Sequence, residues 1–337
     1  MSNEDFIIGE HRVVAGSRTR CRLRVSRLPT DTWLSVPVEV VHGRQSGPAL
    51  WLTAAIHGDE LNGVEIIRRV LTQVRPRTLR GTVIAVPIVN VFGFIEQQRY
   101  LPDRRDLNRS FPGSANGSLA ARLANILLRD IVRPCTHGID LHTGSLHRTN
   151  LPQIRANLDD PETLALARAF GTRVIKHADT RDGSLRKAAA KAGNKVLLFE
   201  GGEALRFDEN AIAQGTDGVM RVLAALQMVV EPPPPLETPV LTVRKSHWLR
   251  ARRAGIVRIQ TPLGARVVAG EQLGIIQDTF GVRVCRVLAR TSGIVIGKSL
   301  NPLVNQGDAL LHVGQLEDGD SSQAETSRAP RSHGSPG

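Results

Sequence analysis

Two short stretches of the chain carry histidine and carboxylate side chains in positions suited to metal binding. The first is an apolar run over residues 50–56 that leads directly into His57, with Glu60 three residues further on. Such a run is typical of a buried strand, and residues 61–74 then carry apolar side chains at helical spacing. His57 and Glu60 are therefore expected where a strand ends and a helix begins, the usual place for sites in open α/β sheets.

A third ligand must come from elsewhere, because a catalytic zinc takes three protein ligands and leaves a fourth position for water. The best candidate is His142, which ends a second short apolar run and is followed by Thr and Gly. Asp140 lies two residues earlier on the same expected strand, so it faces the same way and can orient His142 as a ligand. Taken singly, each histidine is more often a hydrogen-bonded loop residue, and Glu60 is more often a carboxylate favoured by a helix dipole.

A long polar stretch over residues 90–117 contains a cluster of arginines. Loops of this length inside a compact domain are usually functional, and clustered arginines repel one another unless an anion lies among them. Asn108 and Arg109 are candidates for binding a substrate carboxylate, since a planar guanidinium matches a carboxylate and the amide adds a donor. The alternative is a surface loop whose arginines pair with Asp103 and Asp106.

Glu200 is the candidate general base. It follows four apolar residues, 196–199, which are expected to form a strand that ends there, and two glycines come after it. An apolar setting makes a carboxylate a better proton acceptor near neutral pH. Glu203 is the rival, but it lies beyond the glycine turn, where a side chain is more often solvated.

The elements around these residues predict an α/β fold. Strand, helix and strand follow one another from residue 50 to residue 89, which indicates a parallel unit. Residues 10–41 alternate apolar and polar positions, as two strands joined by a turn would. Further helices are expected at 119–132, 161–170, 183–192 and 210–230, and further strands at 173–176 and 195–199.

A proline-rich linker at 231–239 separates residues 1–230, the α/β domain, from a smaller domain at 240–316. The smaller domain contains two glycine-punctuated repeats, 254–276 and 292–313, which predict an all-β unit. It resembles the barrel-sandwich hybrid of lipoyl and biotinyl carriers, although the expected hairpin lysine is missing and Lys298 is off the pattern. Residues 317–337 are polar and serine-rich, which favours a disordered tail.

Composition narrows the classes of function. The chain has 337 residues and a formal charge of +12, carried mostly by arginine, but only 4% aromatic residues. Because the basic residues are scattered and few aromatic rings are present to stack on bases, we expect no nucleic-acid partner, and the charge favours small anionic substrates.

No apolar run of about 18 residues and no secretory signal occur, so we expect no membrane span and a cytoplasmic protein. Cys21, Cys135 and Cys285 are odd in number, which argues against a disulfide framework.

Four motifs in order resemble the succinylglutamate desuccinylase and aspartoacylase family, a branch of the zinc carboxypeptidase superfamily. They are 57–60 (His-Gly-Asp-Glu), 106–109 (Asp-Leu-Asn-Arg), 140–142 (Asp-Leu-His) and Glu200. The resemblance implies a mostly parallel, mixed sheet flanked by helices, with the small all-β domain capping or flanking the site. It also implies one Zn²⁺ per chain, held by His57, Glu60 and His142.

The same resemblance implies a zinc hydrolase that cleaves the linear amide of a small, anionic N-acyl amino acid. Glu200 would activate the attacking water, while Asn108 and Arg109 would bind the substrate carboxylate. Arg99 matches the family's arginine that stabilises the oxyanion, although two extra residues separate it from the 106–109 motif. Arg104 is the alternative candidate for this role. Members of this length with a C-terminal β domain include deacylases of N-acetylated diamino acids.

Two other functions stay open at this point. A metallocarboxypeptidase acting on short peptides would need an open cleft, whereas a C-terminal domain over the pocket mouth would admit only small molecules. A relative that binds metal or ligand without catalysis is the other alternative, but Glu200, which is not a zinc ligand, weighs against it. The sequence does not identify the acyl group or the amino acid of the substrate. It also leaves open whether the protein forms a homo-oligomer, and whether cobalt, manganese or nickel replaces zinc.

Overall fold

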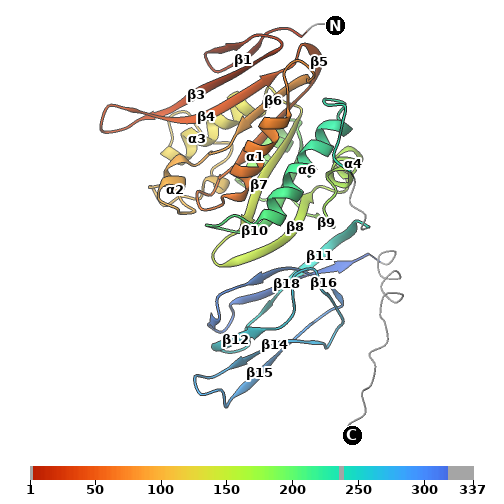
Figure 1. The fold of residues 1–337 in the computed structure, drawn as a ribbon. Coiled ribbons are helices and arrows are strands. Elements are labelled where there is room, and N and C mark those ends of the chain that lie inside the picture. The colour runs from red at the N-terminus through yellow and green to blue at the C-terminus, as the bar shows by residue number, and fades with distance from the viewer. Residues whose placement is uncertain (1–2, 235–238, 318–337) are drawn as a thin grey trace.

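The computed structural model describes residues 3–234 and 239–317. Within these residues one 12-stranded sheet runs through the molecule in the order β13, β16, β18, β11, β9, β8, β10, β7, β5, β6, β4, β3 (Figure 1). The strands that the larger domain contributes are β3 (Ser17–Arg27), β4 (Trp33–His42), β5 (Gln45–Ala54), β6 (Arg80–Val86), β7 (His137–Gly144), β8 (Arg148–Ala156), β9 (Val174–His177) and β10 (Lys195–Glu203). A small hairpin of β1 (Phe6–Ile8) and β2 (His11–Val13) precedes them.

The centre of the sheet is parallel, as the alternation of strands and helices predicts. β5 pairs in parallel with both β6 and β7, and β7 pairs in parallel with β10. The carboxyl ends of β5, β7 and β10 therefore meet at one edge, which is where binding sites form in such sheets. Antiparallel strands β4 and β8 flank this centre, so the predicted mixed α/β fold is confirmed.

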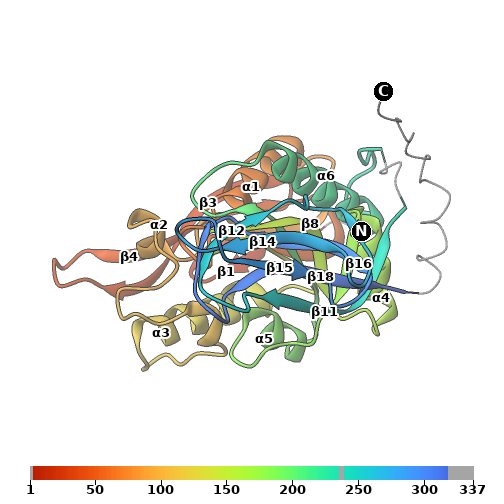
Figure 2. The same ribbon diagram turned by 90° about the horizontal axis from the view of Figure 1, so that it is seen from below.

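Helices cover both faces of the sheet (Figure 2). Apolar side chains of α1 (Asn62–Gln73), α4 (Pro161–Phe170) and α6 (Glu209–Ala225) pack against one face. Those of α3 (Leu119–Ile126), its π-helical continuation η2 (Leu127–Val132) and α5 (Leu185–Lys191) pack against the other. The two cores fix the strand ends that carry His57 and His142.

The C-terminal β domain continues the same sheet. Its strands are β11 (Leu241–Arg250), β12 (Gly255–Ile259), β13 (Arg266–Val267), β14 (Gln272–Gln277), β15 (Val284–Leu288), β16 (Gly293–Ser299), β17 (Leu303–Val304) and β18 (Ala309–Leu316). Strand β11 pairs with β9, and strand β16 pairs with β8. The second sheet of the domain consists of β15, β14, β12 and β17 and lies over a separate apolar core. The domain is thus joined to the larger one by backbone hydrogen bonds as well as by residues 231–239. Of the predicted linker, 235–238 lie outside the described residues, as does the predicted tail from 318 onward.

Three sequence expectations need correction. The long loop over 90–117 contains two short helices, α2 (Val91–Ile95) and η1 (Leu107–Arg109). α6 ends at Ala225 rather than at residue 230, and the chain turns there so that Met228 is buried. β10 does not end at Glu200 but continues to Glu203 through a bulge, which Gly202 permits with a φ of +72°.

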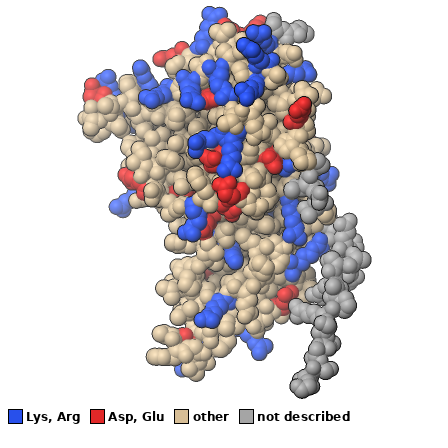
Figure 3. Space-filling model, viewed as in Figure 1, with Lys and Arg blue, Asp and Glu red and all other residues tan. Residues whose placement is uncertain are grey.

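The outer edge of the sheet is strongly basic. Among the described strands, β3 ends the sheet, and it presents four exposed arginines at alternate positions, Arg18, Arg20, Arg22 and Arg24. Basic side chains are visible across this part of the surface in Figure 3. Part of the positive charge therefore forms a row, contrary to the expected scatter, and charged edge strands of this kind resist pairing with other chains. Over the described residues, each helix is too short or too polar to cross a membrane.

Candidate metal centre and active-site pocket

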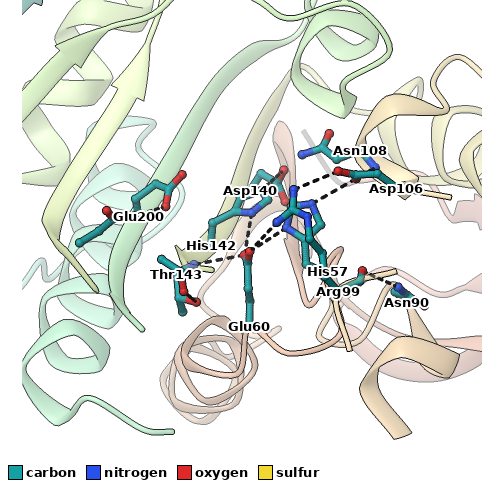
Figure 4. A network of polar contacts seen from close by, with 12 residues as sticks. His57, Glu60, Asn90, Arg99, Asp106, Asn108, Asp140, His142, Thr143 and Glu200 are labelled. Carbon is teal, nitrogen blue, oxygen red and sulfur yellow. Dashed lines mark hydrogen bonds and ion pairs between the residues drawn. The ribbon is translucent and has the colours of Figure 1, made fainter. Parts of the chain in front are cut away.

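His57, Glu60 and His142 come together at the carboxyl ends of β5 and β7 (Figure 4). Their nearest ligand atoms all lie within 4.8 Å of one another, and all three side chains are buried. The Glu60 carboxylate lies between the imidazoles, with Oε1 2.7 Å from His57 Nδ1 and Oε2 2.8 Å from His142 Nδ1. Both histidines therefore direct Nδ1 at the same carboxylate, and the three side chains that the sequence analysis proposes as ligands lie together.

A second carboxylate contacts the other ring nitrogen, Nε2, of each imidazole. Asp140 Oδ2 is 2.8 Å from His142 Nε2, and Thr53 donates a hydrogen bond of 2.7 Å to the other oxygen of Asp140. Asp106 Oδ1 is 3.3 Å from His57 Nε2. Carboxylates in these positions fix the orientation of a ligating histidine and increase its basicity. The role expected for Asp140 matches this geometry, whereas the position of Asp106 was not foreseen.

The loop between β5 and α1 is shaped by two backbone features. Ala55 has a φ of +48°, a left-handed conformation that is costly for a residue with a side chain. Gly58 lies against helix α2, and a Cβ at this position would be 1.9 Å from the carbonyl carbon of Gly93. Gly58 is therefore needed for close approach to a neighbouring segment, a reason that the sequence pattern alone does not reveal.

Charges within the cluster are strongly coupled. Burial by itself lowers the pKa of a histidine, but the Glu60 carboxylate outweighs it and raises the pKa of His57. Burial likewise opposes the charged form of His142, yet Asp140 and Glu60 raise its pKa well above the usual value. For Glu60, burial raises the pKa, while the two imidazoles hold it well below its ordinary range. Without an ion the cluster thus retains protons, which a bound cation would displace.

The donor set fits zinc. Two imidazole nitrogens and one carboxylate, buried and oriented by further carboxylates, are the ligand types and number found in catalytic zinc sites. Each of the three offers its donor atom toward the others, so no rearrangement of the backbone is needed. His57 Nδ1, Glu60 and His142 Nδ1 are the atoms that would hold the ion.

Arg99, rather than Arg104, lies beside this cluster. The Arg99 guanidinium is 3.5 Å from Glu60 Oε1 and 3.0 Å from Asp106 Oδ2, and it lines the pocket. Arg104 is exposed on the loop, where its φ is +60°. The geometry therefore favours Arg99 as the arginine near the reacting atoms.

Asn108 and Arg109 line the same pocket from helix η1. The backbone N–H of Leu185 donates a 2.9 Å hydrogen bond to Asn108 Oδ1 and so fixes the amide. Burial lowers the pKa of Arg109, and Arg181 lowers it further, although Asp106 acts in the opposite direction. An anionic ligand placed here would relieve this repulsion.

Glu200 reaches the pocket from β10, on the opposite side of the cluster from Asn108 (Figure 4). Its surroundings are polar, which corrects the apolar setting expected from sequence. Asn150 Nδ2 donates a 2.6 Å hydrogen bond to Glu200 Oε2, and Arg155 forms a 3.0 Å ion pair with Oε1. The rival Glu203 pairs instead with Arg206 at 2.6 Å.

Comparison with known proteins agrees with the motifs. The model of the succinylglutamate desuccinylase/aspartoacylase catalytic domain matches residues 46–226, which is more than half of the chain. The chain belongs to the succinylglutamate desuccinylase/aspartoacylase family. The matched residues include His57, Glu60, His142 and Glu200.

Three relatives of known sequence or structure extend over most of this family member. The N-alpha-acetyl-L-2,4-diaminobutyric acid deacetylase of Halomonas elongata is 28% identical over 298 residues, covering 83% of this chain and 86% of its own. The structure of a succinylglutamate desuccinylase/aspartoacylase from Rhodobacter sphaeroides superposes with a TM-score of 0.81 at 27% identity, covering 89% and 96% of the two chains. The product-bound ectoine utilization protein EutE (DoeB) from Ruegeria pomeroyi has the same fold, with a TM-score of 0.80 at 24% identity, covering 88% and 95%.

This family member also uses residues that sequence reasoning missed. The pocket has a volume of about 820 Å³, and the C-terminal β domain supplies part of its wall through Ser246, Trp248 and His312. Trp248 stacks on His312 with ring centroids 4.7 Å apart, and the Arg148 guanidinium lies 5.3 Å from the Trp248 ring. No local pattern marks these residues, because they meet only when β18 pairs with β11 and β11 pairs with β9.

Proposed function

We propose that the protein is a zinc-dependent deacylase that hydrolyses the amide bond of a small N-acyl amino acid. The observation that carries this proposal is the buried cluster of His57, Glu60 and His142, with Glu200 facing the same pocket as a carboxylate that is not part of the cluster. The family of the chain supports it, since its relatives include a deacetylase and a succinylglutamate desuccinylase/aspartoacylase. A zinc ion held by the cluster would supply Lewis acidity, which lowers the pKa of water and polarises a carbonyl group.

The chain's own residues have distinct parts in this reaction. Glu200, held at both oxygens, accepts a proton from the attacking water and delivers it to the leaving amine. Arg99 donates hydrogen bonds to the oxygen that becomes negative in the tetrahedral transition state. Asn108 and Arg109 bind the carboxylate of the amino acid and so place the scissile amide between Arg99 and Glu200.

The pocket favours a substrate that carries negative charge at both ends. Among the described residues that line it, nine are lysine or arginine and three are carboxylates. Three of these cations, Lys176, Arg155 and Arg186, lie close together, and Arg155 pairs with Glu200; we call the three the cationic end. Lys176 forms no ion pair with a described carboxylate, and the hydrogen bonds of Arg186 go to the backbone carbonyls of Ala178 and Asp179.

A second carboxylate on the acyl side of the substrate would neutralise this end. With the amino acid at Asn108 and Arg109 and the amide near the metal ligands, the acyl group points past Glu200 toward Lys176. A dicarboxylic acyl group such as succinyl fits this charge pattern, and a cationic substrate would be repelled by the excess of basic residues that line the pocket. The wall formed by the C-terminal domain also supports a small substrate rather than a peptide.

The test is turnover by the purified, zinc-loaded protein on matched N-acyl amino acids. N-succinyl amino acids should be hydrolysed faster than the N-acetyl forms of the same amino acids, and N-acetyl-2,4-diaminobutyrate should be a poorer substrate. Glu200→Gln should retain zinc and lose about 10²- to 10⁴-fold in kcat, the usual contribution of a general base, while Glu203→Gln should stay active. Wild-type protein that binds zinc but hydrolyses none of these amides would contradict the proposal.

A further inference from the structure

Strand β16 connects the C-terminal β domain directly to the neighbourhood of Glu200. It pairs antiparallel with β8, with Gly297 opposite Asn150 and Lys298 opposite Thr149. Gln153, a buried residue of β8, donates a 3.0 Å hydrogen bond to the backbone carbonyl of Ile296. The junction is therefore an extension of the sheet, and a shift of β16 would move the part of β8 that carries Asn150.

Asn150 lies between this junction and the proposed base. Its side chain is buried, and its Nδ2 donates the 2.6 Å hydrogen bond to Glu200 Oε2. Because a carboxylate accepts hydrogen bonds and does not donate them, the amide nitrogen must be the atom that faces Glu200. The amide oxygen then faces β16, where it meets Gly297.

Gly297 leaves the space that the Asn150 amide occupies. A Cβ at position 297 would be 2.8 Å from Asn150 Oδ1 and 3.4 Å from His312 Cβ. The first of these contacts is closer than a side chain tolerates, so any larger residue would push the amide. The push would be transmitted along a rigid planar group to its nitrogen, and so to Glu200.

We propose that the C-terminal β domain positions the catalytic glutamate, and that Asn150 is the positioning residue through which Gly297 acts. The inference rests on the proposed role of Glu200. Arg155 holds Oε1 and Asn150 holds Oε2, so the two donors together fix the plane of the carboxylate. A general base needs this control, because displacement by about 1 Å can reduce a rate 10²-fold.

Kinetics of a double-mutant cycle test the proposal on the full-length, zinc-loaded protein. Asn150→Ala and Gly297→Ala should each lower kcat by about 10- to 100-fold, with KM and zinc content unchanged. If Gly297 acts through Asn150, adding Gly297→Ala to Asn150→Ala should cause no further loss. Multiplied losses in the double variant would overturn the proposal, because the two residues would then act independently.

Gly314→Ala is the matched control. Gly314 lies on β18 of the same domain. A Cβ there would be 2.8 Å from Val243 Cγ1, the same distance as that between a Cβ at position 297 and Asn150 Oδ1. It imposes a comparable clash within the domain but away from Asn150. Its kcat should equal that of the wild type, and a loss equal to that of Gly297→Ala would show a general effect of domain strain and overturn the proposal.

Two further measurements keep the test decisive. If Gly297→Ala does not fold, kcat of the Asn150→Asp variant is measured instead, because aspartate has the same shape as asparagine but cannot donate a hydrogen bond to Glu200. A loss of kcat in this variant supports the proposal, and unchanged kcat overturns it. If the wild type hydrolyses no substrate, crystal structures of the wild type and of Gly297→Ala are compared. Loss of the contact between Asn150 and Glu200 in the variant would support the positioning role of Asn150, although the proposed function would have failed. An unchanged contact would overturn the positioning role.

Discussion

Replacing Lys176 with methionine should stabilise the protein while weakening its recognition of a substrate with two carboxylates. Methionine has a similar length and volume but no charge. Burial lowers the pKa of Lys176 to about 8, and the neighbouring Arg155 contributes further repulsion. The two residues lie opposite each other on the parallel strands β8 and β9. A lysine kept charged under such conditions has a cost in folding free energy that methionine avoids.

The size of that cost follows from the pKa. A fall from 10.5 to about 8, at about 1.4 kcal/mol per pKa unit, gives at most about 3.5 kcal/mol. The value is an upper limit because the side chain is only partly buried. Since the folded-state pKa is the lower one, the unfolded chain binds the extra proton between pH 8 and 10.5, and wild-type stability should rise through that window. The advantage of the variant is therefore full below pH 8 and disappears above about 10.5.

Denaturant unfolding at pH 7 and pH 10.5 measures the first effect, and steady-state kinetics measures the second. Loss of a charged hydrogen bond of about 1.5–3 kcal/mol should reduce kcat/KM for N-succinyl substrates by about 10- to 100-fold. The corresponding N-acetyl substrates should lose much less. Lys191→Met, at an exposed position at the end of α5, is the control and should change the unfolding free energy by no more than about 0.5 kcal/mol.

A Lys176→Met variant that is less stable than the wild type at pH 7 would refute the expected cost of the buried charge, because Lys176 would then make a net stabilising contact. An equal loss of activity on N-succinyl and N-acetyl substrates would refute the assignment of the cationic end to a second carboxylate, even if the stability change were as expected.

Three further outcomes are expected. His142→Ala should reduce zinc, measured by plasma emission, from about one ion per chain to near none; full occupancy in the variant would exclude His142 as a ligand. Asp106→Asn should weaken zinc binding by about 10- to 100-fold in a chelator competition, because His57 loses the carboxylate behind it. Arg99→Ala should lower kcat by about 10²-fold or more, whereas Arg104→Ala should leave it unchanged; the reverse result would exchange their roles.

The ligand cluster could be predicted from the sequence because its determinants are local. An apolar run followed by a histidine predicts a buried strand that ends at a polar residue, and this pattern occurs before His57 and again before His142. Parallel strands bring such ends to one edge of a sheet, so the two runs also predict that the side chains meet. The α/β fold class follows from the same alternation of strands and helices.

Other features depended on contacts between distant segments. Glu200 was expected at a strand end because two glycines follow it, but pairing with β7 and β8 carries β10 onward through a bulge to Glu203. Asn150 and Lys176 carry no local signal. Their position beside the pocket follows from the strand order that places β8 between β10 and β9.

The sequence by itself was therefore sufficient to indicate the proposed metal ligands and the general base, since each belongs to a motif encoded within a few positions and the four motifs occur in order. Only the tertiary structure decided what surrounds them. The pairing of β8 with β16 brings Gly297 against Asn150, and the pairing of β9 with β11 brings Trp248 to the pocket wall. These neighbours are more than 60 residues away in the chain from the groups they contact, and such contacts depend on the order of strands in the sheet, which local propensity does not specify.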